Sequence, residues 1–280
     1  MDADVGIVAQ RGNERAHELT RTLVETIERE REDAAVVVDE ETGTAVDERS
    51  VPVAAMADRD LVVSIGGDGT LLFVAREVGD TPILGVNLGE VGFLNAVPPA
   101  DAVSVVADLV DRLRAGEELG GRTLSRLRAT DDTGAWTLEP ALNEIVVHGP
   151  RRGSGGGATI DVRIDGERYA RSHVDGVLVS TPTGSTAYNL SEGGPLVHPT
   201  ANALVVTQMA ATDAMPPLVV DPDTDVSLTV SDAESAYVIS DGRNRHRLDP
   251  PATVSVSLAA EPVTLVGPQT NFVDGLEKLE

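Results

Sequence analysis

The chain has 280 residues, which is enough for one large domain or for two ordinary domains that each bury a core. Its 46 acidic and 22 basic residues give a formal net charge of −24, which opposes binding to nucleic acid or to an anionic membrane surface. The absence of cysteine excludes disulfides, thiolate metal sites and thiol catalysis.

The kind of basic residue is informative, because Lys278 is the only lysine and all the others are arginines. Together with the acidic balance and an aromatic content of 2%, this usage is typical of halophilic proteins, whose self-repulsion is screened by molar salt. No stretch of membrane-spanning length lacks charges, and the start of the chain is not basic as in a signal peptide. We therefore expect a cytoplasmic protein with no membrane or nucleic-acid partner.

Short apolar runs alternate with helical stripes over residues 1–118. We predict strands at 5–9, 34–38, 61–65 and 81–86, and helices at 14–30, 70–78 and 103–113. This alternation predicts an α/β domain with a parallel sheet that is covered on both faces. Ligands bind such sheets at the carboxyl ends of the strands, which is where Asp68 and Asn87 lie in the sequence.

After Gly120 and Gly121 the pattern changes to short β-rich runs. They lie at 122–129, 143–148, 158–164, 176–180, 204–207, 226–230, 237–240 and 254–258. Asp165-Gly166 and Asp241-Gly242 have hairpin-turn chemistry. We predict a mostly-β sandwich over 119–268, followed by a C-terminal segment, 269–280, that packs back on the first domain and includes a short helix.

The stretch Gly66-Gly67-Asp68-Gly69-Thr70 follows the apolar run 61–65 directly. Glycines let the backbone approach a ligand, and the N–H groups at a helix start favour anions, so the loop suits phosphate. Asp68 has the wrong charge to hold phosphate itself. It fits a base for a hydroxyl that attacks phosphorus, or a ligand for the Mg²⁺ that accompanies a nucleotide. The alternative is an ordinary helix cap.

Two further stretches are rich in polar groups. Asn143-Glu144 places an amide beside a carboxylate at the start of a strand, where the pair can hold sugar hydroxyls or an adenine edge. By itself the pair is more simply a strand edge. The stretch 181–188, Thr-Pro-Thr-Gly-Ser-Thr-Ala-Tyr, follows Asp175-Gly176 and a β run, and its density of hydroxyl groups indicates contact with a polar ligand.

These motifs in this order resemble the NAD kinase family over about residues 61–199. The resemblance includes Gly85-Val86-Asn87-Leu88-Gly89 and Gly193-Gly194-Pro195, and residues 271–279 are similar to the family's C-terminal segment. The stretch 181–188 is specific to that family, whereas the glycine motif is shared with lipid kinases of the diacylglycerol type and with phosphofructokinases.

The resemblance implies a Mg²⁺-dependent kinase that transfers a phosphoryl group from ATP or polyphosphate to the adenosine ribose 2′-hydroxyl of NAD, giving NADP. It also implies a Rossmann-like N-terminal domain, a β-sandwich C-terminal domain and a homodimer or homotetramer. The Mg²⁺ would be held through the substrate phosphates, with Asp68 as a further candidate ligand.

The resemblance also implies roles for individual residues. Asp68 is the candidate catalytic base, and the donor phosphates are lined by Gly66, Gly67, Gly69 and Thr70. Asn143 and Glu144 would bind the adenine and the ribose hydroxyls, and Asn87 would contact the NAD phosphates or ribose. Asp175 would reach the nicotinamide half, and a neighbouring subunit can supply it. The adenine-side wall comprises Thr183, Ser185, Thr186, Ala187 and Tyr188.

One segment departs from the family pattern. Relatives usually carry a histidine and an arginine-proline pair where this chain has residues 207–217. This departure keeps open a non-catalytic NAD(P)-binding relative as an alternative. A lipid kinase is a second alternative, which the net charge and the polar stretch 181–188 disfavour. The sequence leaves open ATP or polyphosphate as donor and NAD or NADH as acceptor.

Overall fold

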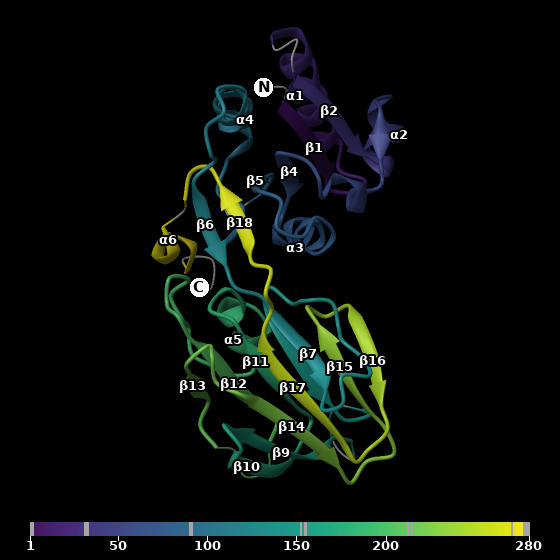
Figure 1. Ribbon diagram of the computed structural model, residues 1–280, viewed down its shortest axis with the longest axis vertical. Coiled ribbons are helices and arrows are strands. Elements are labelled where there is room, and N and C mark those ends of the chain that lie inside the picture. Colours follow the sequence, from purple (N-terminus) through teal and green to yellow (C-terminus); the bar gives the residue numbers. More distant parts are fainter. Residues whose placement is uncertain are drawn as a thin grey trace. The chain divides into compact units, whose positions relative to one another are not determined.

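The computed structural model describes residues 3–30, 34–89, 92–151, 153, 156–211, 213, 215–269 and 271–276. The chain forms two compact units (Figure 1). The first unit comprises Met1–Leu124 with Pro262–Glu280, and the second comprises Ser125–Glu261. These limits differ from the expected 119–268 because β6 (Gly121–Leu124) and β18 (Val263–Val266) pair with each other, and β18 pairs with β5 (Ile83–Asn87) of the first unit.

The first unit is built on a seven-stranded sheet in the order β3-β2-β1-β4-β5-β18-β6. Neighbouring strands from β3 to β18 are parallel, and β6 runs antiparallel to β18. The remaining elements are β1 (Ala3–Ala9), β2 (Ala34–Asp39), β3 (Ser50–Val51), β4 (Leu61–Gly66), α1 (Glu14–Glu30), α2 (Glu40–Val46), α3 (Asp68–Glu77), α4 (Pro99–Arg114), α6 (Phe272–Leu276) and the 3₁₀ helix η1 (Val53–Met56). The α/β class predicted from the sequence is therefore confirmed.

Strand β4 lies in the middle of this sheet, between β1 and β5, and all six of its residues are buried. A strand that is covered on both faces needs a continuous apolar run, and Leu61 to Ile65 supply one with Ser64 as the exception. Helix α1 buries Leu23, Val24 and Ile27 in the same core. Burial of each such side chain contributes on the order of 2 kcal/mol. The glycine loop therefore emerges from a rigid central strand.

The second unit contains two antiparallel sheets. One has five strands in the order β10-β9-β14-β17-β7, and the other has six in the order β13-β12-β11-β8-β15-β16. Their bounds are β7 (Leu127–Asp131), β8 (Glu144–His148), β9 (Ala158–Ile164), β10 (Glu167–Val174), β11 (Gly176–Ser180), β12 (Leu204–Met209), β13 (Leu218–Val220), β14 (Val226–Ser231), β15 (Ala236–Ser240), β16 (Asn244–Leu248) and β17 (Ala252–Leu258). Buried side chains of both sheets form one hydrophobic core, which confirms the predicted sandwich.

Both predicted Asp-Gly turns form hairpins. Asp165 (φ 49°) and Gly166 (φ 80°) join β9 to β10, and Asp241 (φ 45°) and Gly242 (φ 69°) join β15 to β16. Positive φ at both central residues matches the twist of the flanking strands, and aspartate and glycine tolerate it best. The stretch that the sequence left irregular contains a 3₁₀ helix, η2 (Thr183–Thr186), and one helical turn, α5 (Tyr188–Ser191).

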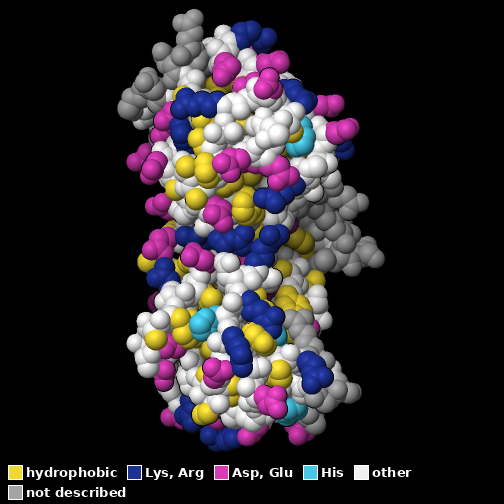
Figure 2. All heavy atoms as spheres, turned by 90° about the vertical axis from the view of Figure 1, so that its right-hand side faces the viewer, with side chains coloured by type: hydrophobic (Ala, Val, Ile, Leu, Met, Phe, Trp, Pro, Cys, Tyr) yellow, Lys and Arg dark blue, Asp and Glu magenta, His cyan; other side chains and the backbone are white. Residues whose placement is uncertain are grey.

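Charged side chains cover the surface. Figure 2 shows acidic groups spread over the face in view, with arginines between them. Asp161 of β9 is bound by two arginines, Arg163 at 3.1 Å and Arg168 at 2.7 Å. Most other ion pairs of the described residues are exposed, and such pairs contribute little to stability. Among the helices that the structure describes, none is long and apolar enough to cross a membrane.

Candidate active-site residues

Asp68 is the first residue of α3 and lies directly beyond the end of β4. The turn between them requires glycine at position 66, because a Cβ there would lie 2.5 Å from Thr70 Oγ1. No side chain would obstruct Gly67 or Gly69, whose Cβ positions meet open space. The structure therefore leaves free backbone on both sides of one carboxylate, as a phosphate-binding loop requires.

The Asp68 carboxylate is bound by the loop 92–95 that follows β5. Oδ2 accepts a hydrogen bond from Phe93 N at 3.1 Å, and Oδ1 accepts from Asn95 Nδ2 at 3.0 Å and from the backbone N of Leu94 and Asn95 at 3.4 Å. The loop approaches so closely that a Cβ at Gly92 would lie 2.1 Å from Oδ1. Four N–H donors on one carboxylate fix its position.

Asn95 is a further residue of this site, and the sequence alone does not predict it. Its side chain is fully buried, its amide nitrogen binds Asp68, and its Oδ1 has no hydrogen-bond partner in the described structure. A Cβ at Gly85 would lie 2.4 Å from that oxygen, so the glycine of β5 makes room for the amide. The available signal was an asparagine within an otherwise apolar segment next to a glycine-rich stretch, and only the fold links it to Asp68.

Asn87 ends β5, at the same edge of the sheet as Asp68. Its side chain is 4% exposed, and its Oδ1 accepts a hydrogen bond from Gly89 N at 3.1 Å. Its carboxamide thus shapes the loop after β5, and the predicted contact with NAD remains a proposal.

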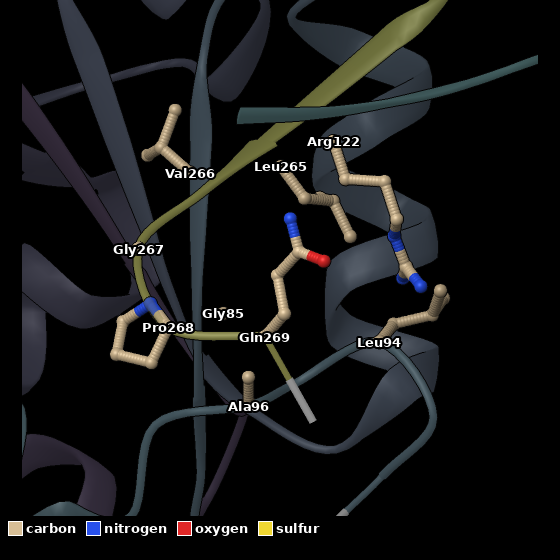
Figure 3. A pocket seen from close by; sticks show the side chains of 9 residues that line it. All are labelled: Gly85, Leu94, Ala96, Arg122, Leu265, Val266, Gly267, Pro268 and Gln269. Carbon is tan, nitrogen blue, oxygen red and sulfur yellow. The ribbon is translucent and has the colours of Figure 1, made fainter. Parts of the chain in front are cut away.

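A small pocket lies behind the loop that binds Asp68 (Figure 3). Its lining comprises Gly85, Leu94, Ala96, Arg122, Leu265, Val266, Gly267, Pro268 and Gln269, and its volume is about 20 Å³. Burial lowers the pKa of the Arg122 guanidinium, which extends along the pocket. A cavity of this size holds roughly one water molecule, so it does not accommodate a nucleotide.

In the second unit, Asn143 and Glu144 lie where β8 begins, beside the end of β11. The carboxylate of Asp241 accepts hydrogen bonds from the backbone N of Leu142 (2.7 Å), Asn143 (2.8 Å) and Glu144 (3.1 Å). The sequence alone predicts Asp241 only as a turn residue. The structure makes it the anchor of the segment that carries the candidate NAD-binding pair.

Glu144 is 6% exposed, and its Oε2 has no hydrogen-bond partner in the described structure. Burial first, and the negative charge of Asp241 second, raise the pKa of Glu144 to about 8, while the backbone N–H of Tyr188 acts in the opposite direction. A buried carboxyl oxygen without a donor is costly for the folded protein, and it retains the capacity to accept a ligand hydroxyl.

The hydroxyl-rich stretch packs against the same segment. Thr181 binds Leu142 O through Oγ1 at 2.6 Å and Asn143 O through its N–H at 2.9 Å. A Cβ at Gly184 would lie 2.1 Å from Asn143 O, so only glycine fits there. Ser185 is fully buried, and its hydroxyl donates to Val197 O and accepts from Val197 N. The Ser185 hydroxyl therefore stabilises the loop itself.

The other predicted wall residues remain partly accessible. These are Thr183, Thr186, Ala187 and Tyr188. The Thr186 hydroxyl donates to Thr183 O, and the Tyr188 ring packs on an apolar cluster formed by Val146, Leu178 and Met209. The structure thus brings these residues to the segment that carries Asn143 and Glu144.

Asp175 does not join this group. It lies before β11, whose far end, Ser180, is the residue opposite Glu144. The length of that strand separates Asp175 from Glu144 by roughly 15 Å within the unit. The carboxylate of Asp175 accepts a hydrogen bond from Gly153 N at 2.8 Å.

The described residues contain no group of three or more His, Asp or Glu side chains that could hold a metal ion. Asp68 is a single carboxylate with four N–H donors already bound to it. This donor set does not form an all-protein metal cage. It fits Mg²⁺ that is held mainly by substrate phosphates and water, with at most one carboxylate.

Two family models match the chain. They are the ATP-NAD kinase N-terminal domain at residues 5–113 and the ATP-NAD kinase C-terminal domain at residues 142–267. Curated relatives include an NAD kinase from Haloarcula marismortui, 52% identical over 98% of this chain and 99% of its own length, and one from Halobacterium salinarum, 50% identical over 99% of each.

Solved structures share the fold. Yeast NADH kinase complexed with NADH matches with a TM-score of 0.85 over 99% of this chain and 87% of its own. An NAD kinase from Archaeoglobus fulgidus in complex with ATP matches with a TM-score of 0.76 over 99% of this chain and 98% of its own. Both are 22% identical in sequence, so this likeness concerns the fold alone.

Proposed function

The chain belongs to the NAD kinase family of phosphotransferases, and on that premise we propose that it transfers the terminal phosphoryl group of ATP to the adenosine ribose 2′-hydroxyl of NAD. The products are NADP and ADP. The observation that carries the proposal is a single carboxylate, Asp68, held in a fixed position beside a glycine loop with open backbone.

Asp68 acts as the general base. Its carboxylate takes the proton of the 2′-hydroxyl as that oxygen bonds to phosphorus, and the bond to the departing ADP breaks. Gly66, Gly67, Gly69 and Thr70 line the donor phosphates at the start of α3, where the first turn of a helix favours anions. Magnesium ion, when bound through those phosphates, neutralises charge on the transferring group.

The second unit provides most of the residues that recognise NAD. The free Oε2 of Glu144 accepts a hydrogen bond from the ribose hydroxyl that does not react, and the Asn143 amide pairs with the adenine edge. Thr183, Thr186, Ala187 and Tyr188 line the adenine side, with Ser185 holding their loop. Asn87 and Asp175 remain assigned to the NAD phosphates or ribose and to the nicotinamide half.

The test is an assay of NADP⁺ formation in high KCl with Mg²⁺, in which ATP is compared with polyphosphate and NAD with NADH. We expect ATP-dependent formation of NADP⁺. Absence of any phosphorylated dinucleotide with every donor and acceptor would contradict the proposal, and NAD binding without turnover would favour a non-catalytic NAD(P)-binding protein.

Glu144→Gln tests the recognition role in the same assay. A neutral amide binds a ribose hydroxyl less well than a carboxylate, at a cost of roughly 1–3 kcal/mol, so the KM for NAD should rise by about tenfold. The KM for ATP should change much less. An increase confined to the KM for ATP would assign Glu144 to the other substrate.

We further propose that the protein is a cytoplasmic homodimer or homotetramer. Exposed apolar side chains support self-association, because Leu196, Met215 and Val219 of the second unit are 42%, 44% and 52% exposed. Val219 lies on β13, an edge strand of the six-stranded sheet. Light scattering in molar KCl measures the assembly, and a monomer at micromolar concentration would contradict the proposal.

A further inference from the structure

We propose that Asp241 is a positioning residue for NAD recognition, whose carboxylate fixes the backbone of residues 142–144 and thereby aims Asn143 and Glu144 at the adenosine half of NAD. The inference rests on the proposed function. It extends that function to a residue of the β15–β16 turn, nearly 100 positions away in sequence from the pair it orients.

The geometry of the contact is specific. Three consecutive backbone N–H groups converge on one carboxylate at 2.7, 2.8 and 3.1 Å, and Asp241 N donates in return to Glu144 O at 3.1 Å. Hydrogen bonds to an ionised acceptor are about twice as strong as neutral ones. These contacts determine the direction in which the chain enters β8. They therefore also set the direction of the Asn143 and Glu144 side chains.

Turn chemistry alone does not explain these bonds. The β9–β10 hairpin has the same Asp-Gly sequence with both residues at positive φ. There the Asp165 side chain accepts a hydrogen bond from a single backbone group, Asp225 N at 3.0 Å. The two hairpins therefore form a matched pair within one unit, and only the Asp241 turn binds the segment of the candidate site.

The carbonyl groups of the same segment are held from the other side. Thr181 binds Leu142 O and Asn143 O, and the missing side chain of Gly184 lets the stretch 181–188 close against Asn143. With the backbone fixed on both sides, the groups left for a ligand are the side chains. The Asn143 amide has no hydrogen bond in the described structure, and Glu144 Oε2 has none either.

Asp241 also changes the charge behaviour of Glu144. The groups that face Glu144 are Asp241 from the β15–β16 turn, Ser180 opposite on β11 and the N–H of Tyr188 from α5. Burial first, and Asp241 second, raise the pKa of Glu144 to about 8, so the free protein holds this carboxyl protonated at pH 7. A ribose hydroxyl that donates to Glu144 binds its ionised form more tightly, because a carboxylate accepts stronger hydrogen bonds than a neutral carboxyl group, and NAD binding then releases a proton.

This coupling fixes the sign of the pH dependence. Below pH 8 the affinity for NAD should rise with pH, by up to tenfold per unit, and it should level off above the pKa. Removal of the charge at position 241 lowers the pKa of Glu144, and the rising limb should move to lower pH. If Asn143 and Glu144 also lose their positions, the affinity for NAD on the plateau above the pKa should be lower as well.

The experiment is calorimetric titration of the folded protein with NAD from pH 6 to 9 in molar KCl, with steady-state kinetics alongside. Asp241→Asn keeps the shape and removes the charge, and Asp165→Asn is the matched control. We expect Asp241→Asn to weaken NAD binding at the plateau by about tenfold or more and to shift the limb to lower pH, with the KM for ATP within about threefold. Asp165→Asn should match the parent protein.

Asp241→Asn that binds NAD within twofold of the parent, with an unshifted limb, overturns the inference. A uniform loss of affinity without the shift also overturns it, because it shows a merely structural role. If Asp241→Asn does not fold, Asp241→Glu is the second variant, because it keeps the charge and moves the carboxylate. It should lower the plateau affinity for NAD and leave the pH of the rising limb unchanged. A parent protein that binds NAD but forms no NADP⁺ contradicts the proposed function alone, and a parent that binds no NAD overturns both.

Discussion

The two units present their key carboxyl groups in opposite environments. Asp68 receives four N–H donors from the loop 92–95, whereas Glu144 is 6% exposed and its Oε2 has no hydrogen-bond partner in the described structure. Both groups lie at a strand end that points out of a well-packed core. The difference is in the backbone nearby, which supplies donors to Asp68 and binds Asp241 instead of the Glu144 side chain.

The contrast separates two ways in which a protein prepares a carboxyl group. A carboxylate surrounded by donors is fixed in place and suits a reaction that depends on geometry. A buried carboxyl group with one oxygen that lacks a donor is a cost that the folded protein bears until a ligand supplies one. The first suits chemistry at the transferring group, and the second suits recognition of a substrate rich in hydroxyls.

The largest effect should come from the fixed carboxylate. Asp68→Asn should reduce the kcat for NADP⁺ formation by about 10²- to 10⁴-fold, because general-base catalysis contributes that much. Binding of NAD, measured by calorimetry, should stay within a few-fold of the parent. A variant that keeps more than half of its activity would remove Asp68 from the catalytic role and with it the contrast between the two groups.

The buried carboxyl group should affect stability in a pH-dependent way. The pKa of Glu144 is raised in the folded state from 4.5 to about 8, so the folded protein holds a proton that the unfolded chain releases. Its contribution to stability is fully present below about pH 4.5 and is lost as pH rises through about 8. Glu144→Gln, which stays neutral, should therefore raise the free energy of unfolding relative to the parent by a few kcal/mol at pH 9 and change it little at pH 5. Equal differences at both pH values in denaturant titrations would show that Glu144 is not a buried titrating group.

The donors around Asp68 should matter less than Asp68 itself. Asn95→Ala removes the side-chain hydrogen bond to Oδ1 and leaves the backbone donors in place. We expect the kcat to fall by about tenfold with the KM for NAD nearly unchanged, as for the loss of one hydrogen bond to a charged group. Asn202→Ala, which removes an exposed asparagine side chain, is the control and should leave the kcat unchanged. A rise in the KM for NAD with an unchanged kcat would place Asn95 on the recognition side.

The smallest and most general effect concerns the surface. At about 0.01 M salt the screening length is near 30 Å, and at about 1 M it is near 3 Å, so a chain of charge −24 should gain in thermal midpoint and in kcat/KM as KCl increases. Sucrose at low salt should raise the thermal midpoint without the gain in kcat/KM. Sucrose is excluded from the protein surface and so stabilises the fold, but it does not screen charges. The ratio of Asp68→Asn activity to parent activity should stay constant as salt increases, because salt screens the contact between Asp68 and the bound substrate only weakly. An unchanged midpoint in dilute buffer would contradict the role of the acidic surface.

Much of the fold followed from local pattern. The apolar runs at 5–9, 34–38, 61–65 and 81–86 predicted the parallel strands, and the Asp-Gly pairs at 165 and 241 predicted two hairpins that form. These signals are local, because strand burial and positive φ depend on the residues that occupy the positions themselves. The sequence also predicted the family and a halophilic composition, and the two curated relatives described above come from halophilic archaea.

Long-range contacts decided the rest. Strands β6 and β18 belong to the first sheet because β18 pairs with β5 and β6 pairs with β18, each across more than a hundred residues, which no local pattern encodes. Asn95 reaches Asp68 only because Gly85 leaves room for its amide, and Asp241 reaches residues 142–144 only because β15 pairs with β8. The sequence by itself determined the family, most of the central strands and the main candidate residues. The tertiary structure decided which donors each carboxyl group receives, because hydrogen bonds between distant segments depend on the packing that brings those segments together.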